Sequence, residues 1–188
     1  MWCCVGTGME NHGKYGQFIY THDDNSLYVN LFVASELDWK DRGVVLRQET
    51  AFPYGETSRI VVAKGKGQFE LKVRKPSWVA DGKFAVTVNG KAVSAQADAD
   101  GYVSVDRKWK KGDKVSVHFD MEPRTVKAHG KVEADRGRVA VERGPVVYCA
   151  EWPDNNCDVL SVLMNRNPKF EVEKASMTIE NAGVTVTH

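Results

Sequence analysis

The residues best suited to chemistry stand at the start of the chain, where Trp2 precedes the adjacent pair Cys3 and Cys4. Two neighbouring thiols can hold one metal ion, or one thiol can act as a nucleophile beside a metal that the other binds. Zinc converts a bound thiol to the thiolate at neutral pH. A structural zinc site needs four protein ligands and a catalytic one about three. The pair by itself supplies at most two of them.

The neighbours of the pair leave its role open. Glu10, His12 and His22 follow in the sequence, but none has a recognised ligand spacing to Cys3 and Cys4. Two buried thiols can equally behave as small hydrophobic side chains. From the residues alone, we therefore favour the structural interpretation over a metal or nucleophile site.

Paired carboxylates are a second candidate, since two of them carry out acid–base chemistry on glycosides. Asp23-Asp24 and Glu171/Glu173 are such pairs. Asp23-Asp24 lie in the turn-forming run HDDNS, and carboxylates in a turn before a strand are typically solvated. We therefore interpret them as turn residues.

Five tryptophans raise the possibility of a sugar-stacking face, because apolar sugar faces pack on indole rings. Trp78 follows a Pro-Ser corner and Trp109 ends an alternating run, which is more typical of core or rim anchors.

Cys149 and Cys157 could form a bridge, but a secreted disulfide scaffold is shorter and richer in cysteine. We interpret all four cysteines as free thiols.

The elements that must position these residues are mainly strands. Residues 2–20 carry apolar side chains loosely at helical spacing, but each glycine destabilises a helix by about 1 kcal/mol relative to alanine. We therefore predict one marginal helix that needs a neighbour to pack on. Thereafter β-branched or aromatic residues alternate with polar ones in short runs. These are 26–35, 43–52, 57–64, 67–76, 83–93, 101–109, 113–121, 124–130, 137–144 and 145–152.

Turn residues separate these runs, and Asn89-Gly90 is the strongest hairpin signal. We predict a hairpin loop at residues 64–67 as well. Many short strands with such turns indicate a mainly β fold, an antiparallel β-sandwich of jelly-roll-like form. The predicted domains are 1–26, a helical segment; 27–152, the sandwich; and 153–188, the start of a further β region. Within the last, 158–166 is expected to be a short helix or buried strand, and 170–188 a sheet without partners in this chain.

Composition excludes several classes of protein. The 188 residues are 42% hydrophobic and 27% charged, which is ordinary globular composition rather than that of a disordered chain. The formal net charge of +1 provides no basic excess for nucleic acid. The apolar runs are too short for a transmembrane helix, and the N-terminus does not have the pattern of a signal peptide. We therefore expect neither a nucleic-acid nor a membrane partner.

Several stretches taken in order resemble one family. They are CCVGTGMENHGKYGQFIY, SLYVNLFVAS, LKVRKPSW, TVNGK, GYVSVDRKWKKGDKV and GRVAVERGPVVYCAE, which together run from residue 2 to about 152. They resemble the C-terminal half of the β-L-arabinofuranosidases of glycoside hydrolase families 127 and 146, the former domain of unknown function 1680. The order of CC, GTGMEN and RGPVVY carries the resemblance.

The resemblance implies a two-part zinc enzyme. In that family an N-terminal (α/α)6 barrel holds the active site, and β-sandwich domains follow. Carried over, Cys3 would be the nucleophile that attacks the anomeric carbon of a terminal β-L-arabinofuranosyl unit, and Cys3 and Cys4 would both bind zinc. The family's other zinc ligands, a glutamate and a third cysteine, lie upstream of the pair, as does the carboxylic acid of a retaining mechanism. This chain holds no counterpart of them.

The expectation is therefore a sandwich fragment that is inactive and zinc-free alone, with the helical barrel as its partner and an arabinose-containing glycan as the substrate of the whole enzyme. Dimer contacts through the sandwich are a further expectation. The resemblance implies a bacterial source and a cytoplasmic or periplasmic location. Two alternatives stay open: a free-standing carbohydrate-binding module, and an interaction domain whose cysteines are incidental.

Overall fold

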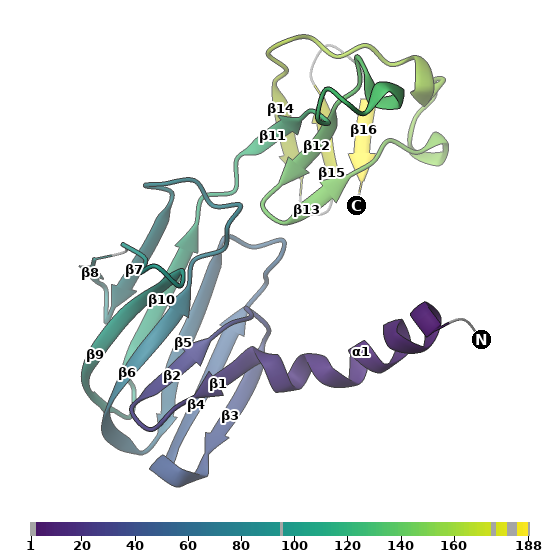
Figure 1. Cartoon of the computed structure of the whole chain (residues 1–188). Coiled ribbons are helices and arrows are strands. Elements are labelled where there is room, and N and C mark those ends of the chain that lie inside the picture. The colour runs from purple at the N-terminus through teal and green to yellow at the C-terminus, as the bar shows by residue number, and fades with distance from the viewer. Residues whose placement is uncertain (1–2, 95, 174–175, 180–183, 188) are drawn as a thin grey trace. The chain divides into compact units, whose positions relative to one another are not determined.

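The computed structural model describes residues 3–94, 96–173, 176–179 and 184–187. The chain divides into two compact units after Asp120 (Figure 1). The predicted domain boundary at 152 lies well inside the second unit. Alternating strand patterns continue from residue 113 to 152 without a change of composition, so hydrophobic periodicity carries no mark of the division at 120. Each unit is described by itself below.

The first unit contains one helix followed by ten strands, as its residue pattern predicts. Most strands alternate buried and exposed side chains, which is the pattern of a strand with one face on a core. The elements are α1 (Cys3–Ile19), β1 (Tyr20–His22), β2 (Ser26–Val29), β3 (Ser35–Trp39), β4 (Val44–Thr50), β5 (Thr57–Lys64), β6 (Lys66–Arg74), β7 (Phe84–Val88), β8 (Lys91–Val93), β9 (Tyr102–Lys110) and β10 (Lys114–Phe119). A 3-10 turn, Lys40–Arg42, links β3 to β4.

These strands form two sheets, which confirms the mainly β sandwich fold. One sheet has the order β1-β2-β6-β9 and the other β3-β4-β5-β10-β7-β8. All pairings are antiparallel except that of β2 with β6. The two inner faces meet in one apolar core, in which Trp39 of the six-stranded sheet lies edge-on to Phe69 of the four-stranded sheet at 5.4 Å between ring centroids. Phe119 packs against Phe32 at 4.6 Å.

The turns partly follow the prediction. Asn89 and Gly90 both have positive φ, 51° and 80°, and join β7 to β8 in the predicted hairpin. The prediction of a hairpin at residues 64–67 is wrong, because β5 and β6 belong to different sheets. Gly65 (φ 85°) turns the chain from one sheet to the other there, and a Cβ at this position would overlap the carbonyl oxygen of Gly43. A glycine turn has the same sequence signature in both cases.

The run 26–35 is another place where the structure differs from the alternation pattern. Only Ser26–Val29 forms a strand, and residues 30–34 leave the four-stranded sheet and cross to β3 in the six-stranded sheet. The side-chain amide of Gln48 in β4 donates to the carbonyl oxygens of Leu31 and Val33 at 3.0 and 2.9 Å. These bonds replace the ladder partners that the backbone gives up.

The second unit is smaller and has two three-stranded antiparallel sheets. Its elements are β11 (Pro123–Val126), β12 (Ala140–Arg143), β13 (Val146–Tyr148), β14 (Phe170–Glu173), β15 (Ser176–Ile179) and β16 (Val184–Thr187), with 3-10 turns at Glu133–Asp135, Trp152–Asp154 and Val159–Ser161. Val141, Tyr148 and Met177 form its buried centre. So small a core gives limited stability.

Two expectations for this region need correction. Residues 158–166 form neither a regular helix nor a buried strand: one 3-10 turn is followed by irregular chain, and Leu163 is 90% exposed. The strands of 170–188 do have partners, since β14, β15 and β16 pair with one another. No helix among the described residues combines the length and the apolar character needed to cross a membrane.

Candidate functional site

Cys3 and Cys4 open the only α-helix of the described residues, and both side chains are exposed. Their sulfur atoms lie 3.7 Å apart. The peptide N–H groups of a first helical turn favour negative charge beside them, and α1 has no acidic side chain in its first turn. Within this chain the two thiols are therefore exposed and not packed into an apolar core.

The sulfur separation suits a shared zinc ion. With zinc–sulfur bonds near 2.3 Å and tetrahedral angles, two thiolates on one ion lie about 3.8 Å apart. Cys3 and Cys4 already have this spacing. Among the described residues, however, no group of three potential ligands comes together. The pair fits two corners of a tetrahedral site, and the other corners would come from outside these residues.

The other candidate ligands are not brought to the pair. Glu10 forms an ion pair with Lys14 one turn further along α1, at 3.6 Å. The Nδ1 atom of His12 lies 2.9 Å from the carbonyl oxygen of Gly8. His22 lies on β1, and its ring packs against Trp39 with 5.4 Å between centroids. Each has a local structural contact that accounts for it.

A buried polar network fixes the C-terminal end of α1. Tyr20, the residue after the helix, has its hydroxyl 3.0 Å from Ser35 Oγ and 3.4 Å from Gln48 Nε2. Burial raises the pKa of Tyr20, which keeps the hydroxyl neutral. Ser58 donates to the side-chain oxygen of Gln48 at 3.1 Å. The role of Gln48 could not be predicted from the sequence, because a lone glutamine in an alternating strand carries no signal of burial.

The paired carboxylates do not form an acid–base site. Asp23 accepts from the backbone N–H groups of Asn25 and Ser26 and from the Tyr28 hydroxyl, at 2.7–2.9 Å. These hydrogen bonds lower its pKa, which is the wrong direction for a general acid. Glu171 and Glu173 are exposed residues of β14.

The described tryptophans of the sandwich do not form a sugar-stacking face. Trp39 and Trp109 are buried, and Trp78 stacks on Phe52 with 6.3 Å between centroids. Trp152, in the second unit, is 57% exposed. The core and rim interpretation therefore accounts for the tryptophans of the first unit.

Cys149 and Cys157 are both exposed free thiols, as are Cys3 and Cys4. Desolvation and the neighbouring Glu151 carboxylate raise the pKa of Cys149. A thiol that holds its proton is a weak nucleophile. This leaves the pair on α1 as the candidate functional site.

Comparison with known sequences decides the family. The family profile described as "Beta-L-arabinofuranosidase, GH127 middle domain" matches residues 26–121, and that of the "Glycoside hydrolase family 127 C-terminal domain" matches 123–181. The chain belongs to glycoside hydrolase family 127. The resemblance to the β-L-arabinofuranosidases is thereby confirmed, and the two GH127 profiles meet close to the division between the compact units.

Individual GH127 relatives agree with this assignment. The chain is 31% identical over 166 residues to the non-reducing end β-L-arabinofuranosidase of Bifidobacterium longum subsp. longum, a match that covers 84% of this chain and 24% of the relative. A solved GH127 β-arabinofuranosidase is 40% identical with a TM-score of 0.80, over 90% of this chain and 33% of that one. The GH127 β-L-arabinofuranosidase of Geobacillus stearothermophilus T6 is 34% identical with a TM-score of 0.77, over 90% and 27%.

The chain thus spans about a quarter of the length of the curated GH127 relative and about a third or less of the two solved structures. The first of the two profiles begins at residue 26, so Cys3, Cys4 and α1 precede the matched GH127 domains. The role of the thiol pair rests on its own geometry and on the family resemblance.

Proposed function

We propose that this chain is the thiol-bearing, sandwich part of a longer zinc-dependent GH127 glycosidase that removes terminal β-L-arabinofuranosyl units from glycans with retention of configuration. The observation that carries the proposal is the pair of exposed sulfurs, 3.7 Å apart, at the start of α1. This is a two-ligand half of a tetrahedral zinc site. The match to GH127 over both compact units supports it.

Cys3 and Cys4 would both ligate the zinc, and bound zinc would keep the thiols deprotonated at neutral pH. Cys3 Sγ would attack the anomeric carbon, forming a carbon–sulfur bond as the bond to the leaving oxygen breaks. A carboxylic acid from the rest of the protein would protonate that oxygen. Water would then displace the sulfur by attack from the opposite face, the one that the leaving group had occupied, with the same carboxylate accepting the proton of the water.

The rest of the protein would also cover α1. None of the 17 residues of this helix is buried, and Val5, Met9 and Phe18 expose half or more of their surface. A helix with exposed apolar residues and four glycines is unstable alone. The proposed partner is a helical barrel that packs against α1 and completes the zinc site.

The isolated chain is therefore proposed to be inactive, because it supplies two zinc ligands and no positioned acid. The test compares this chain with the complete gene product, using an aryl β-L-arabinofuranoside as substrate and metal analysis as a second readout. Cys3→Ala in the complete protein is expected to reduce turnover by at least about a thousandfold. Cys4→Ala is expected to lower the bound zinc as well as the rate.

Cys157→Ala is the matched control, since it removes an exposed free thiol of the second unit and should leave both readouts unchanged. Arabinoside hydrolysis by the isolated chain would contradict the proposal. Undiminished turnover and zinc content in Cys3→Ala would contradict it too, and would leave the cysteines incidental.

A further inference from the structure

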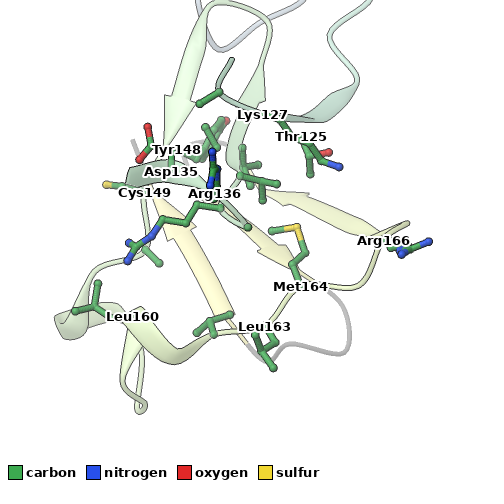
Figure 2. Close-up of a pocket in the computed structure, with 18 of the residues that line it drawn as sticks. Thr125, Lys127, Asp135, Arg136, Tyr148, Cys149, Leu160, Leu163, Met164 and Arg166 are labelled. Atoms are coloured by element: carbon green, nitrogen blue, oxygen red, sulfur yellow. The ribbon is translucent and has the colours of Figure 1, made fainter. Parts of the chain in front are cut away.

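The second unit contains a pocket of about 1120 Å³ that the thiol chemistry does not use (Figure 2). It is lined by the chain between β11 and β12, by the hairpin of β12 and β13, and by the irregular segment 159–167. Small-molecule pockets usually measure about 300–1,000 Å³. The volume therefore suits a segment of a chain better than a single sugar.

The charged lining of this pocket is mostly positive. Lys127, Arg136, Arg138 and Arg166 line it, against one carboxylate, Asp135. Arg136 pairs with Glu133 at 3.0 Å. The side chains of Lys127, Arg138 and Arg166 have no ion pair or hydrogen bond to any described residue. In a chain whose net charge is only +1, cations gathered in one concave surface create a local positive potential that attracts anions.

The pocket also has an apolar side. Figure 2 shows Lys127, Asp135 and Arg136 on one side, and Leu160, Leu163 and Met164 on the other. Leu160 and Leu163 are 72% and 90% exposed. Apolar groups left in water favour a ligand that covers them. A complementary ligand must therefore present both carboxylates or similar anions and apolar C–H surface.

We propose that this pocket binds a uronate-bearing segment of a glycan. Each uronic acid ring carries one carboxylate for a cation and a C–H face for the leucines. The choice of a glycan rests on the proposed glycosidase function, and the choice of an acidic one rests on the charge of the lining. The pocket would hold an acidic region of the polysaccharide and so keep neutral arabinofuranosyl branches near the enzyme.

The test measures binding of an oligogalacturonate to this chain by calorimetry at low salt, beside a neutral oligogalactoside of equal length. We expect binding of the acidic oligomer only. The double variant Lys127→Ala/Arg138→Ala should weaken it about tenfold, as removal of two surface charge pairs does, and 500 mM salt should weaken it further. The matched control is Arg74→Ala/Lys108→Ala, which removes one arginine and one lysine exposed on the first unit.

Four results would overturn the inference: no binding of the acidic oligomer; equal binding of the neutral oligomer; an equal loss in the control variant; or equally tight binding of a polyglutamate of the same charge, which would indicate a polypeptide partner. None of them concerns arabinoside hydrolysis. Failure here therefore leaves the glycosidase proposal intact, and an inactive complete protein would leave the binding result intact.

Discussion

Replacing Gln48 by leucine tests how the chain crosses between the two sheets. Gln48 is 1% exposed, and its amide donates to the carbonyl oxygens of Leu31 and Val33 while accepting from the Ser58 hydroxyl. Leucine has nearly the same volume, so packing is largely preserved. The substitution leaves the Leu31 carbonyl and the buried Ser58 hydroxyl without this partner. The carbonyl of Val33, a residue that is 45% exposed, still accepts from the Ser35 hydroxyl at 2.7 Å.

The cost follows from counting these groups. Each hydrogen bond lost from a buried group costs about 1–1.5 kcal/mol when the remaining partner has no access to water. The bonds to the Leu31 carbonyl and from the Ser58 hydroxyl, 3.0 and 3.1 Å long, then give a loss of about 2–3 kcal/mol. The bond to the exposed Val33 carbonyl adds little, because that carbonyl keeps the Ser35 hydroxyl as a donor. The longer contact to Tyr20, at 3.4 Å, adds little.

The assay is urea unfolding followed by tryptophan fluorescence, because Trp39 and Trp109 are buried in the first unit and report on it. We expect the urea midpoint to fall by about 1–3 M. Gln68→Leu is the matched control, because Gln68 is exposed and its side chain donates a hydrogen bond to the Asp106 carboxylate. It should cost less than about 1 kcal/mol.

A third variant separates hydrogen bonding from volume. Gln48→Glu keeps the shape and one acceptor, but at neutral pH it places a charged carboxylate against two carbonyl oxygens. It should be less stable than Gln48→Leu at pH 7 and recover at acid pH as the carboxylate is protonated. If Gln48→Leu lowers the free energy of unfolding no more than Gln68→Leu does, the hydrogen bonds of Gln48 do not stabilise the passage of the chain between the sheets.

Three further predictions concern other positions. Asp113 is buried. Desolvation raises its pKa, but hydrogen bonds from the Asn89 side chain and the Lys110 N–H lower the pKa more. Since the pKa in the folded protein lies below the usual 3.8, the Asp113 carboxylate stabilises the fold fully above that pH, and this contribution is lost as the pH falls through the folded pKa. Asp113→Asn should therefore cost about 1–2 kcal/mol at pH 7 and almost nothing near pH 2 in denaturation curves. Gly65→Ala should lower the free energy of unfolding by more than about 3 kcal/mol in the same assay, because φ is 85° and the new Cβ would overlap backbone atoms. Gly130→Ala is the control and should cost little, because a Cβ there would meet open space. Equal losses in the two variants would contradict the close approach at Gly65. Iodoacetamide should modify Cys149 more slowly than free cysteine at pH 8, because the pKa of Cys149 is raised. Glu151→Gln should speed the reaction. An unchanged rate would show that the Glu151 carboxylate does not raise the pKa of Cys149.

Strand content was predictable because alternation reports a local property, one buried face. The Asn89-Gly90 hairpin was predictable for the same reason, since both residues tolerate the positive φ that the turn requires. Sheet membership is not local. Gly65 turns the chain between sheets, and its surroundings in sequence look like those of a hairpin glycine. Likewise 30–34 continues the apolar pattern of β2, and it leaves the sheet because distant residues, among them Gln48, supply hydrogen-bond partners for its backbone.

The candidate site was only partly accessible from sequence. Adjacency of Cys3 and Cys4 suggested a metal or nucleophile role, but exposure and the 3.7 Å sulfur separation are properties of the folded helix. The pocket of the second unit had no sequence signal, because its cations and leucines come from segments up to 39 positions apart in the chain, from Lys127 to Arg166. The net charge of the chain does not reveal such a cluster, because it sums positive and negative residues regardless of where they lie in the fold.

The connection between α1 and the sandwich links the fold to the proposed chemistry. The last carbonyl oxygen of α1, on Ile19, accepts from the N–H of Asn30 at 2.9 Å, and Tyr20 joins the Gln48 network at once. The helix that carries the thiols therefore ends on the hydrogen-bonded network around Gln48. Its own residues bury nothing, so its direction is held at this end alone within the described chain. In the proposed enzyme, the sandwich would fix one end of the thiol-bearing helix while another domain covered its length, and together they would position the sulfurs for a site that neither part completes by itself.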